Sequence, residues 1–218
     1  MPVARIAAVC ASVSGEDGPP ALLVDGAQGA GASETDVVAL GADFYLFSGH
    51  KWCCGPSGLA ALYVRPQRLM ELSSPLCDSG GDFRGTSARR MEVATFAYPL
   101  CSGLNQALKL HEAAGGCAER NLLARQSAAT LRAGLRSFGP TLRLLPSAAF
   151  EGATGIVSFS IEGVDSQELV RYLESRQILL SALHRPDCVR ACVHYLTSEE
   201  EIRRLIEEIH RFRRRAFH

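Results

Sequence analysis

Two apolar runs of this 218-residue sequence each end in polar side chains that could do chemistry together. The runs are ALLVD and FYLFS, and both have the composition of short buried strands. Their polar side chains are Asp25 and Gln28 after the first run, and Ser48, His50 and Lys51 after the second. In an open parallel sheet, ligands bind outside the carboxyl ends of the strands. Two neighbouring strands would therefore gather a carboxylate, an amide, a hydroxyl, an imidazole and an amine at one edge.

This set of groups is what pyridoxal phosphate requires. A lysine binds its aldehyde, a buried carboxylate keeps its ring nitrogen protonated, and polar donors hold its ring hydroxyl and phosphate. Lys51, one of only two lysines beside 21 arginines, would be the nucleophilic amine in a partly desolvated pocket. The residues alone leave plainer interpretations open, since an aspartate at a strand end is often a turn cap and a lysine is often solvated.

The elements that position these residues follow an α/β pattern and then an α+β pattern. Apolar runs at 21–25, 43–48 and 59–64 predict strands that alternate with short helices, the first suiting a central parallel strand. Two helical patterns follow, and the second is a long connecting helix that ends at Gly139-Pro140. Beyond it we expect a strand, a helix capped by Asp165, another strand and a terminal helix with Thr or Ser capping; their ranges are 155–163, 165–178, 189–196 and 197–216.

The bulk composition favours a soluble globular protein. Hydrophobic residues make up 47% and charged residues 21%, and the formal net charge is zero, which argues against nucleic acid or an anionic membrane as partner. The sequence has no run of apolar residues long enough to span a bilayer and no secretory signal, so we expect a cytoplasmic protein. The eight cysteines include no C-x-x-C pair and are expected to be free buried thiols.

Two segments carry a family resemblance. VDGAQGAG and DFYLFSGHKWCCGPSGLAALYV resemble the class V aminotransferases, a family of fold-type I pyridoxal-phosphate enzymes that includes cysteine desulfurases, and the resemblance runs over residues 2–212. It implies that Lys51 is the Schiff-base lysine and that Asp25 holds the pyridine nitrogen. It also implies that Gln28 binds the ring hydroxyl, and that Ser48 and His50 bind the phosphate.

Later segments extend the resemblance. In RRMEVATFAYP, Thr95 falls where the family's threonine reaches the phosphate of the partner subunit, which implies a homodimer, and Ala94 replaces the usual glycine. In PDCVRACVHYLT, Arg190 falls on the arginine that binds the substrate α-carboxylate, a role that suits its planar fork. Ser181 stands where similar lyases have a further arginine, and the nearby Arg185 is a candidate to compensate.

These segments are most similar to the cyanobacterial L-cysteine/cystine C–S lyases of the family. The resemblance implies β-elimination on a small amino acid, giving pyruvate, ammonia and a sulfide or persulfide. A cysteine desulfurase would need a nucleophilic cysteine well upstream of Arg190, whereas Cys188 lies two residues before it and is expected to be buried. Other class V reactions, namely transamination, epimerisation or a desulfurase-like reaction, remain alternatives. The spacing of His184, Cys188, Cys192 and His194 fits no familiar zinc pattern, so we expect no metal.

The resemblance also predicts the fold, and the pattern of elements predicts the domain limits. It implies the C-terminal half of a fold-type I transferase, with a partial mixed or parallel sheet and a small α+β domain. We expect the second half of the large cofactor-binding domain at 1–115, a connecting helix at 116–140 and the small domain at 141–218. The family's N-terminal half is missing from this pattern, so we expect an exposed sheet edge, and a catalytically silent fragment that serves as an interaction module is the alternative to a truncated enzyme. The polar loop at 73–90 is short for the lyases, and it would help form the substrate entrance.

Overall fold

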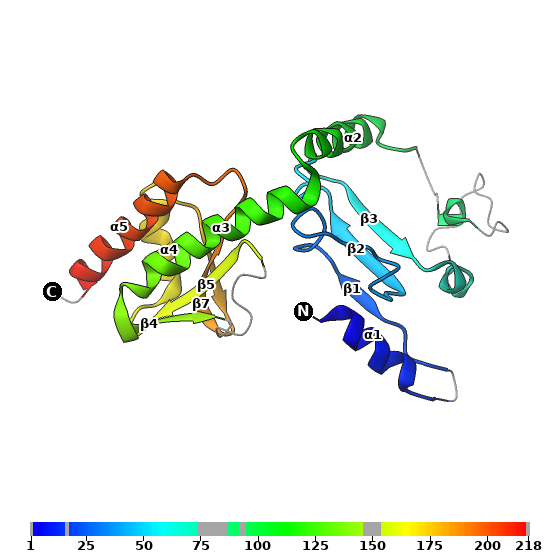
Figure 1. The fold of residues 1–218 in the computed structure, drawn as a ribbon, viewed down its shortest axis with the longest axis horizontal. Helices are drawn as coiled ribbons and strands as arrows, with labels where there is room; N and C mark the ends of the chain where they lie inside the picture. The colour runs from blue at the N-terminus through cyan, green and yellow to red at the C-terminus, as the bar shows by residue number, and fades with distance from the viewer. Residues whose placement is uncertain (1, 16–17, 74–86, 92–94, 146–153, 217–218) are drawn as a thin grey trace. The chain divides into compact units, whose positions relative to one another are not determined.

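A computed structural model describes residues 2–15, 18–73, 87–91, 95–145 and 154–216 of the chain. It divides into two compact units, Met1–Cys117 and Ala118–His218, and each is described by itself (Figure 1). Most of the predicted connecting helix belongs to the second unit. The sequence predicts three ranges where the structure divides into two units, so the three domain ranges stay a prediction.

The first unit is built on a three-stranded mixed sheet with the order β1-β2-β3 (Figure 1). β1 and β2 are parallel, whereas β2 and β3 are antiparallel. Its elements are α1 (Val3–Ser12), β1 (Leu23–Asp25), β2 (Phe44–Ser48), β3 (Ala60–Val64), the 3-10 helices Pro66–Glu71 and Ala88–Met91, and α2 (Tyr98–Ala113). The mixed sheet confirms the predicted fold class. The placement of the first strand was wrong, because β2 is the central strand and β1 pairs only with β2 among the described residues.

The outer strands of this sheet present apolar side chains to solvent. Leu23 on β1 is 59% exposed and Leu62 on β3 is 56% exposed. This agrees with the expectation that the sheet has an exposed edge. Most of the predicted loop at 73–90, together with Ala94, lies outside the described residues.

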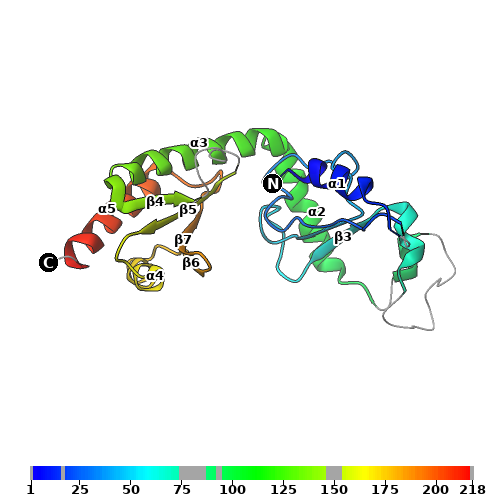
Figure 2. The ribbon, with the colours of Figure 1, turned by 90° about the horizontal axis from the view of Figure 1, so that it is seen from below.

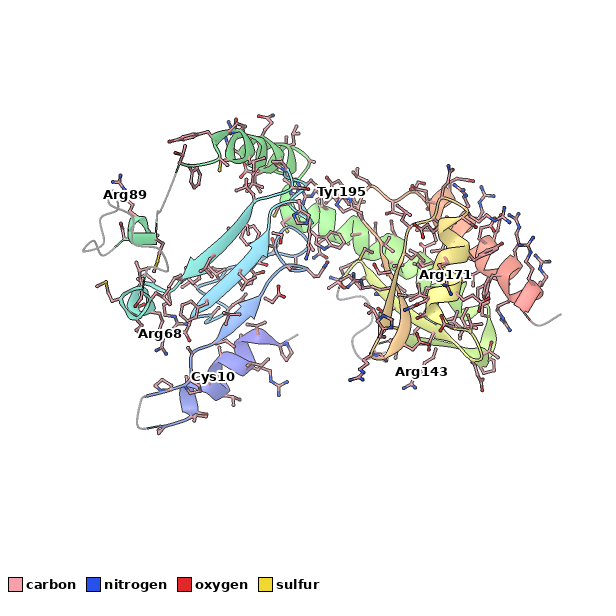
Figure 3. All side chains as sticks on the ribbon, turned by 180° about the vertical axis from the view of Figure 1, so that it is seen from behind. Cys10, Arg68, Arg89, Arg143, Arg171 and Tyr195 are labelled. Carbon is pink, nitrogen blue, oxygen red and sulfur yellow. The ribbon has the colours of Figure 1, made fainter. Side chains whose placement is uncertain are left out.

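A buried carboxylate ties the start of β2 to the chain on both sides of it. Asp43 is 7% exposed, accepts a hydrogen bond from the Leu22 backbone N–H at 2.8 Å, and forms ion pairs with Arg65 at 3.2 Å and Arg68 at 3.3 Å. Arg68 is labelled in Figure 3. Burial raises the pKa of Asp43, but the hydrogen bonds from Leu22 and Arg68 and the two positive charges outweigh it, so the net pKa is lowered.

The second unit is a four-stranded antiparallel sheet with the order β4-β5-β7-β6, accompanied by three helices (Figure 2). Its elements are α3 (Gly116–Arg136), the 3-10 helix Gly139–Thr141, β4 (Leu142–Leu145), β5 (Ile156–Ile161), α4 (Ser166–Glu174), β6 (Ser181–His184), β7 (Asp187–Cys192) and α5 (Glu199–Ala216). The sequence analysis missed β4 and β6, since both are four-residue strands at the edges of the sheet.

The β5 strand shows why this sheet has one apolar and one polar face. Val157, Phe159 and Ile161 are buried in a core shared with α3, α4 and α5, whereas Ser158 and Ser160 alternate with them on the opposite face. The predicted Asp165 cap is confirmed, because its carboxylate accepts a hydrogen bond from the Glu168 N–H at 2.9 Å.

The terminal helix begins with a capping box. The Ser198 hydroxyl accepts from the Glu201 N–H at 3.2 Å, and the Glu201 carboxylate accepts from the Ser198 N–H at 2.8 Å. The prediction of Thr or Ser capping is therefore confirmed, with Ser198 as the cap. Across the described residues, we find no helix with both the length and the apolar character needed to cross a membrane.

The seven described cysteines are free thiols, as predicted, but only Cys53 and Cys188 are buried. The expectation that the thiols are generally buried was therefore wrong. Cys54, beside the buried Cys53, is exposed. In the described part of the chain, no three His, Cys, Asp or Glu side chains gather around a point that could hold a metal ion.

The Asp43 ion pairs predict a pH-dependent contribution to stability. Because the folded-state pKa of Asp43 is lowered from 3.8, its contribution is present above that value and is lost as the pH falls through the folded-state pKa. We expect Asp43→Asn to lower the free energy of unfolding by about 1–2 kcal/mol at neutral pH, since both arginines are partly exposed. Urea unfolding should show this difference shrinking below about pH 4.

Asp36→Asn is the matched control. Asp36 accepts hydrogen bonds from the backbone N–H groups of Val38 and Ala39, and an asparagine oxygen can accept the same bonds. We expect this variant to unfold like the wild type. A deficit of Asp43→Asn that stays constant down to pH 3 would contradict the assignment.

Candidate cofactor site

The parallel pairing of β1 with β2 brings two strand ends to one edge of the first sheet. Asp25 lies opposite Leu46 in the register, and the Gly26 N–H continues the ladder by donating to the Leu46 carbonyl at 2.8 Å. Ser48 ends β2 at the same edge. The structure therefore places the polar residues that follow the two strands near one another, as the sequence predicted.

The turn after β1 is shaped by Tyr45, which comes from the neighbouring strand and is 3% exposed. A Cβ on Gly26 would lie 2.1 Å from the Tyr45 ring, and one on Gly29 would lie 2.9 Å from its hydroxyl. Small residues are needed here because the tyrosine fills the space beneath the turn. Asp25 stabilises the same turn, since its carboxylate accepts a hydrogen bond from the Ala27 N–H at 2.9 Å.

The turn contacts the lysine loop at two points. Trp52 donates its indole N–H to the Gln28 side-chain oxygen at 2.8 Å. Gly31 has φ +80°, and a Cβ there would lie 2.7 Å from the Trp52 carbonyl carbon and 2.8 Å from the Cys53 nitrogen. The two backbones thus approach more closely than any side chain allows.

The lysine loop, residues 49–55, is closed by its own hydrogen bonds. The Gly55 N–H donates to the Gly49 carbonyl at 2.8 Å, and the Cys54 N–H donates to the Lys51 carbonyl at 3.0 Å. The Gly49 N–H donates in turn to the Leu59 carbonyl at 2.9 Å, which anchors the loop to the segment leading into β3. Lys51 is therefore carried by a loop with a fixed backbone.

Helix α2 packs against the lysine loop through one side chain. A Cβ on Gly55 would lie 2.7 Å from Leu104, and one on Gly49 would lie 3.3 Å from it. A larger residue at position 55 would require the Leu104 side chain to move. With α2 against the glycines, the loop leaves His50 and Lys51 exposed to solvent.

Two of the site residues are more exposed than the sequence predicted. We predicted a buried carboxylate and a partly desolvated lysine, but Asp25 and Lys51 are both exposed in this structure. Among the described residues of the first unit, no element covers them. Gln28 and Ser48 are partly buried.

Five of the seven predicted site residues lie at this edge of the sheet. They are Asp25, Gln28, Ser48, His50 and Lys51. Thr95, in the segment before α2, is exposed, and its side chain makes no hydrogen bond within the part of the chain that the structure describes. Its predicted contact with a partner subunit stays a prediction.

The seventh residue, Arg190, lies in the second unit on β7. Its direct cross-strand neighbours are Ser158 on β5 and Ser181 on β6. One terminal nitrogen of its guanidinium is 3.5 Å from the Ser181 hydroxyl, and its buried Nε has no hydrogen-bond partner among the described residues. A guanidinium flanked by hydroxyls and with an unused N–H is suited to bind an anion.

Cys188, two residues before Arg190, is 1% exposed, which confirms the prediction that this thiol is buried. Burial and the charge of Asp187 raise the pKa of Cys188, although Arg190 opposes the shift. A thiol with a raised pKa stays protonated at neutral pH and is a poor nucleophile. Arg185, the predicted compensating arginine, is exposed at the end of β6.

The sequence analysis missed Trp52 as part of the site. Its position directly after Lys51, as the only tryptophan in the chain, was the available signal. It also gave Ser158 no role, although the register makes it a neighbour of Arg190.

Comparison with known proteins identifies the family of this chain. The family model of the class V aminotransferases matches residues 2–205, so the chain belongs to this family. Among curated relatives, a cysteine desulfurase of Dickeya dadantii (strain 3937) is 29% identical over 220 residues, covering 88% of this chain and 50% of that protein. A probable cysteine desulfurase of Pseudomonas aeruginosa is 34% identical over 177 residues, covering 74% of this chain and 41% of that protein.

Solved structures give a more particular similarity. The cystine C–S lyase C-DES, in complex with its reaction product cysteine persulfide, has a TM-score of 0.85 and 36% identity, covering 95% of this chain and 56% of that chain. A variant of C-DES with glycine covalently linked to its PLP cofactor matches equally well, with a TM-score of 0.85 and 36% identity over 95% of this chain and 55% of that one. The Escherichia coli cysteine desulfurase CsdA, at 24% identity, a TM-score of 0.80 and coverage of 96% and 54%, shows the same fold. The chain spans about half the length of the relatives it matches.

The close approach of Gly31 to the lysine loop can be tested with two alanine variants. Gly31→Ala adds both the cost of a positive φ and a clash with the Trp52–Cys53 peptide, whereas Gly18→Ala, at φ +85° with nothing within 4 Å, adds only the first. We expect urea unfolding to show a loss of about 1 kcal/mol for Gly18→Ala and about 2–4 kcal/mol for Gly31→Ala. Equal losses would mean that the loops are not held in contact.

Proposed function

We propose that this chain carries the lysine-bearing part of a pyridoxal-phosphate-dependent C–S lyase that acts on cystine or cysteine by β-elimination. The observation that carries the proposal is the closed loop that presents Lys51 beside the turn of Asp25 and Gln28. The similarity to a cystine C–S lyase over 95% of the chain supports it.

The residues present fit the cofactor in kind. An amine, a carboxylate, an amide, a hydroxyl and an imidazole follow two adjacent strands. A Cβ on Gly26 or Gly29 would clash with Tyr45, and a Cβ on Gly31 would clash with the Trp52–Cys53 peptide, so the turn lies close against the loop at Gly31. When bound, pyridoxal phosphate would supply an electron sink for the carbanion formed at the substrate α-carbon.

Each side chain then has a role that follows from its chemistry. Lys51 would hold the aldehyde, and its amine, once displaced by the substrate amine, would take the α-proton as general base. Asp25 would keep the ring nitrogen protonated, and Gln28 would bind the ring oxygen. Ser48 and His50 would donate to the phosphate, and neither side chain makes a hydrogen bond among the described residues.

Arg190 would bind the substrate α-carboxylate, supported by its unused Nε and its serine neighbours. The Cβ–S bond of the substrate then breaks. The sulfur leaves as sulfide from cysteine or as cysteine persulfide from cystine. Addition of water to the remaining three-carbon unit releases pyruvate and ammonia.

Desulfuration is the second candidate, because the curated relatives are named cysteine desulfurases. That reaction transfers sulfur to a protein thiolate and leaves alanine, whereas elimination leaves pyruvate. Two described thiols lie two residues from Arg190 in sequence. Cys188 is buried and has a raised pKa, so it is a poor nucleophile, which favours elimination. Cys192, on the other side of Arg190 in sequence, is exposed. The organic product distinguishes the two reactions, and other class V reactions give neither product from cysteine.

We also propose that the chain dimerises and that Thr95 acts across the interface. The support is an exposed aromatic pair beside Thr95: Phe96 is 58% exposed and Tyr98 is 73% exposed, with ring centroids 6.0 Å apart. A cytoplasmic location is part of the proposal, since the seven described cysteines are all free thiols.

The two lysines of the chain provide a matched test of the cofactor role. Lys51→Ala should abolish the visible absorbance band that appears when pyridoxal phosphate condenses with a lysine amine, together with pyruvate release from cystine. Lys109→Ala, on the exposed side of α2, should leave both unchanged. A folded wild-type chain that gives no band would refute the enzymatic proposal and leave the interaction-module alternative.

The carboxylate role of Arg190 predicts a change in KM. Loss of charge-assisted hydrogen bonds in Arg190→Gln should cost about 2–3 kcal/mol, or roughly 30–150-fold in the KM for cystine, with a smaller effect on kcat. Arg143→Gln is the control, because Arg143 lies exposed on β4 of the same sheet (Figure 3). Equal KM values for the two variants would contradict the assignment.

A further inference from the structure

The hydrogen bond between Trp52 and Gln28 fixes the orientation of an amide. The indole Nε1 donates to the Gln28 Oε1 at 2.8 Å. An indole N–H can only donate, so the amide atom that faces it must be the oxygen and not the nitrogen. The orientation of the Gln28 amide therefore follows from the chemistry of its partner.

This orientation leaves Gln28 with donors to offer. Within the described residues, the indole contact is the only hydrogen bond that the Gln28 side chain makes. Its oxygen faces the indole, so both N–H groups of the amide stay available. A ligand atom that meets the exposed part of this amide would therefore have to be a hydrogen-bond acceptor.

The Trp52 indole is held where it can fix the orientation of the Gln28 amide. Trp52 is 7% exposed, and its backbone carbonyl lies in the close contact with Gly31. Gly31 and Gln28 belong to the same turn, so the backbone contact and the side-chain hydrogen bond join the same two loops. A buried, well-packed indole has little freedom to release the amide.

We infer that Trp52 is a positioning residue that locks the Gln28 side chain as a hydrogen-bond donor. The inference rests on the proposed function, because the acceptor it points to is the anionic ring oxygen of pyridoxal phosphate. A phosphate oxygen would equally accept, but Ser48 and His50 already provide donors for the phosphate. With the cofactor bound, a donor held against its ring oxygen would stabilise negative charge on that oxygen. The pH midpoint of the visible band should therefore lie lower than it would without Gln28.

The orientation itself can be tested without cofactor. Trp52 is the only tryptophan, so the indole N–H signal in an NMR spectrum belongs to it alone. We expect this N–H to exchange with solvent about tenfold faster in Gln28→Leu, which removes the acceptor, than in the wild type. Gln28→Glu keeps an oxygen for the indole and should exchange slowly. Equal rates in the wild type and Gln28→Leu would overturn the inference.

The effect on the ligand can be tested with pyridoxal phosphate added to the whole chain. The readout is the pH midpoint of the visible band. Gln28→Glu replaces the donor with a carboxylate and should raise the midpoint by about one pH unit. Trp52→Phe keeps an aromatic ring but frees the amide to rotate, and it should raise the midpoint by a smaller amount. The double variant, with both Gln28→Glu and Trp52→Phe, should have a pH midpoint close to that of Gln28→Glu alone.

The outcomes separate this inference from the proposed function. If Gln28→Glu shifts the midpoint and Trp52→Phe does not, Gln28 acts without the indole and the inference is wrong. If the wild type shows no band, the proposed function fails, while the exchange measurement still decides whether the indole orients the amide. The exchange measurement compares the wild type, Gln28→Leu and Gln28→Glu, all of which retain the indole, so it tests the orientation even if Trp52→Phe does not fold.

Discussion

The parallel pairing of β1 with β2 is the constraint on which the site depends. It sets Asp25 opposite Leu46 and brings the residues after both strands to one edge of the sheet. A slip of one residue would reverse which side chains of β1 face the core, removing Val24 from it. It would also move the turn of Gln28 away from the lysine loop. The glycines of that turn and the Trp52–Gln28 hydrogen bond then fix the distance between the two loops.

The two units of the chain contribute different kinds of chemistry. The first unit presents an amine, a carboxylate and an amide from loops with fixed backbones. The second presents a guanidinium from the middle of an antiparallel sheet, between two serines. Strand β7 packs its alternate residues, Val189 and Ala191, in the core, so Arg190 is held by a rigid element and not by a loop. A group that is proposed to recognise one end of a small substrate would benefit from that rigidity.

Much of the fold could be predicted from sequence because its elements are strongly patterned. The alternation of β5, the capped helices and the apolar runs of β2 and β3 were all recognisable, and the family resemblance supplied the proposed site residues. The short edge strands β4 and β6 could not be recognised from the sequence, because four residues carry little periodicity. The exposure of Lys51 could not be predicted, since it depends on what covers the sheet edge. The Trp52–Gln28 hydrogen bond spans 24 residues and arises only when the register brings the loops together.

The most direct test of the central claim is to find which amine holds the cofactor. The wild-type chain would be incubated with pyridoxal phosphate, reduced with borohydride, digested and mapped by mass spectrometry. The account predicts a reduced adduct on the peptide that contains Lys51, with none on Lys109. An adduct spread over Lys109 and the terminal amine, or no adduct in folded protein, would contradict it.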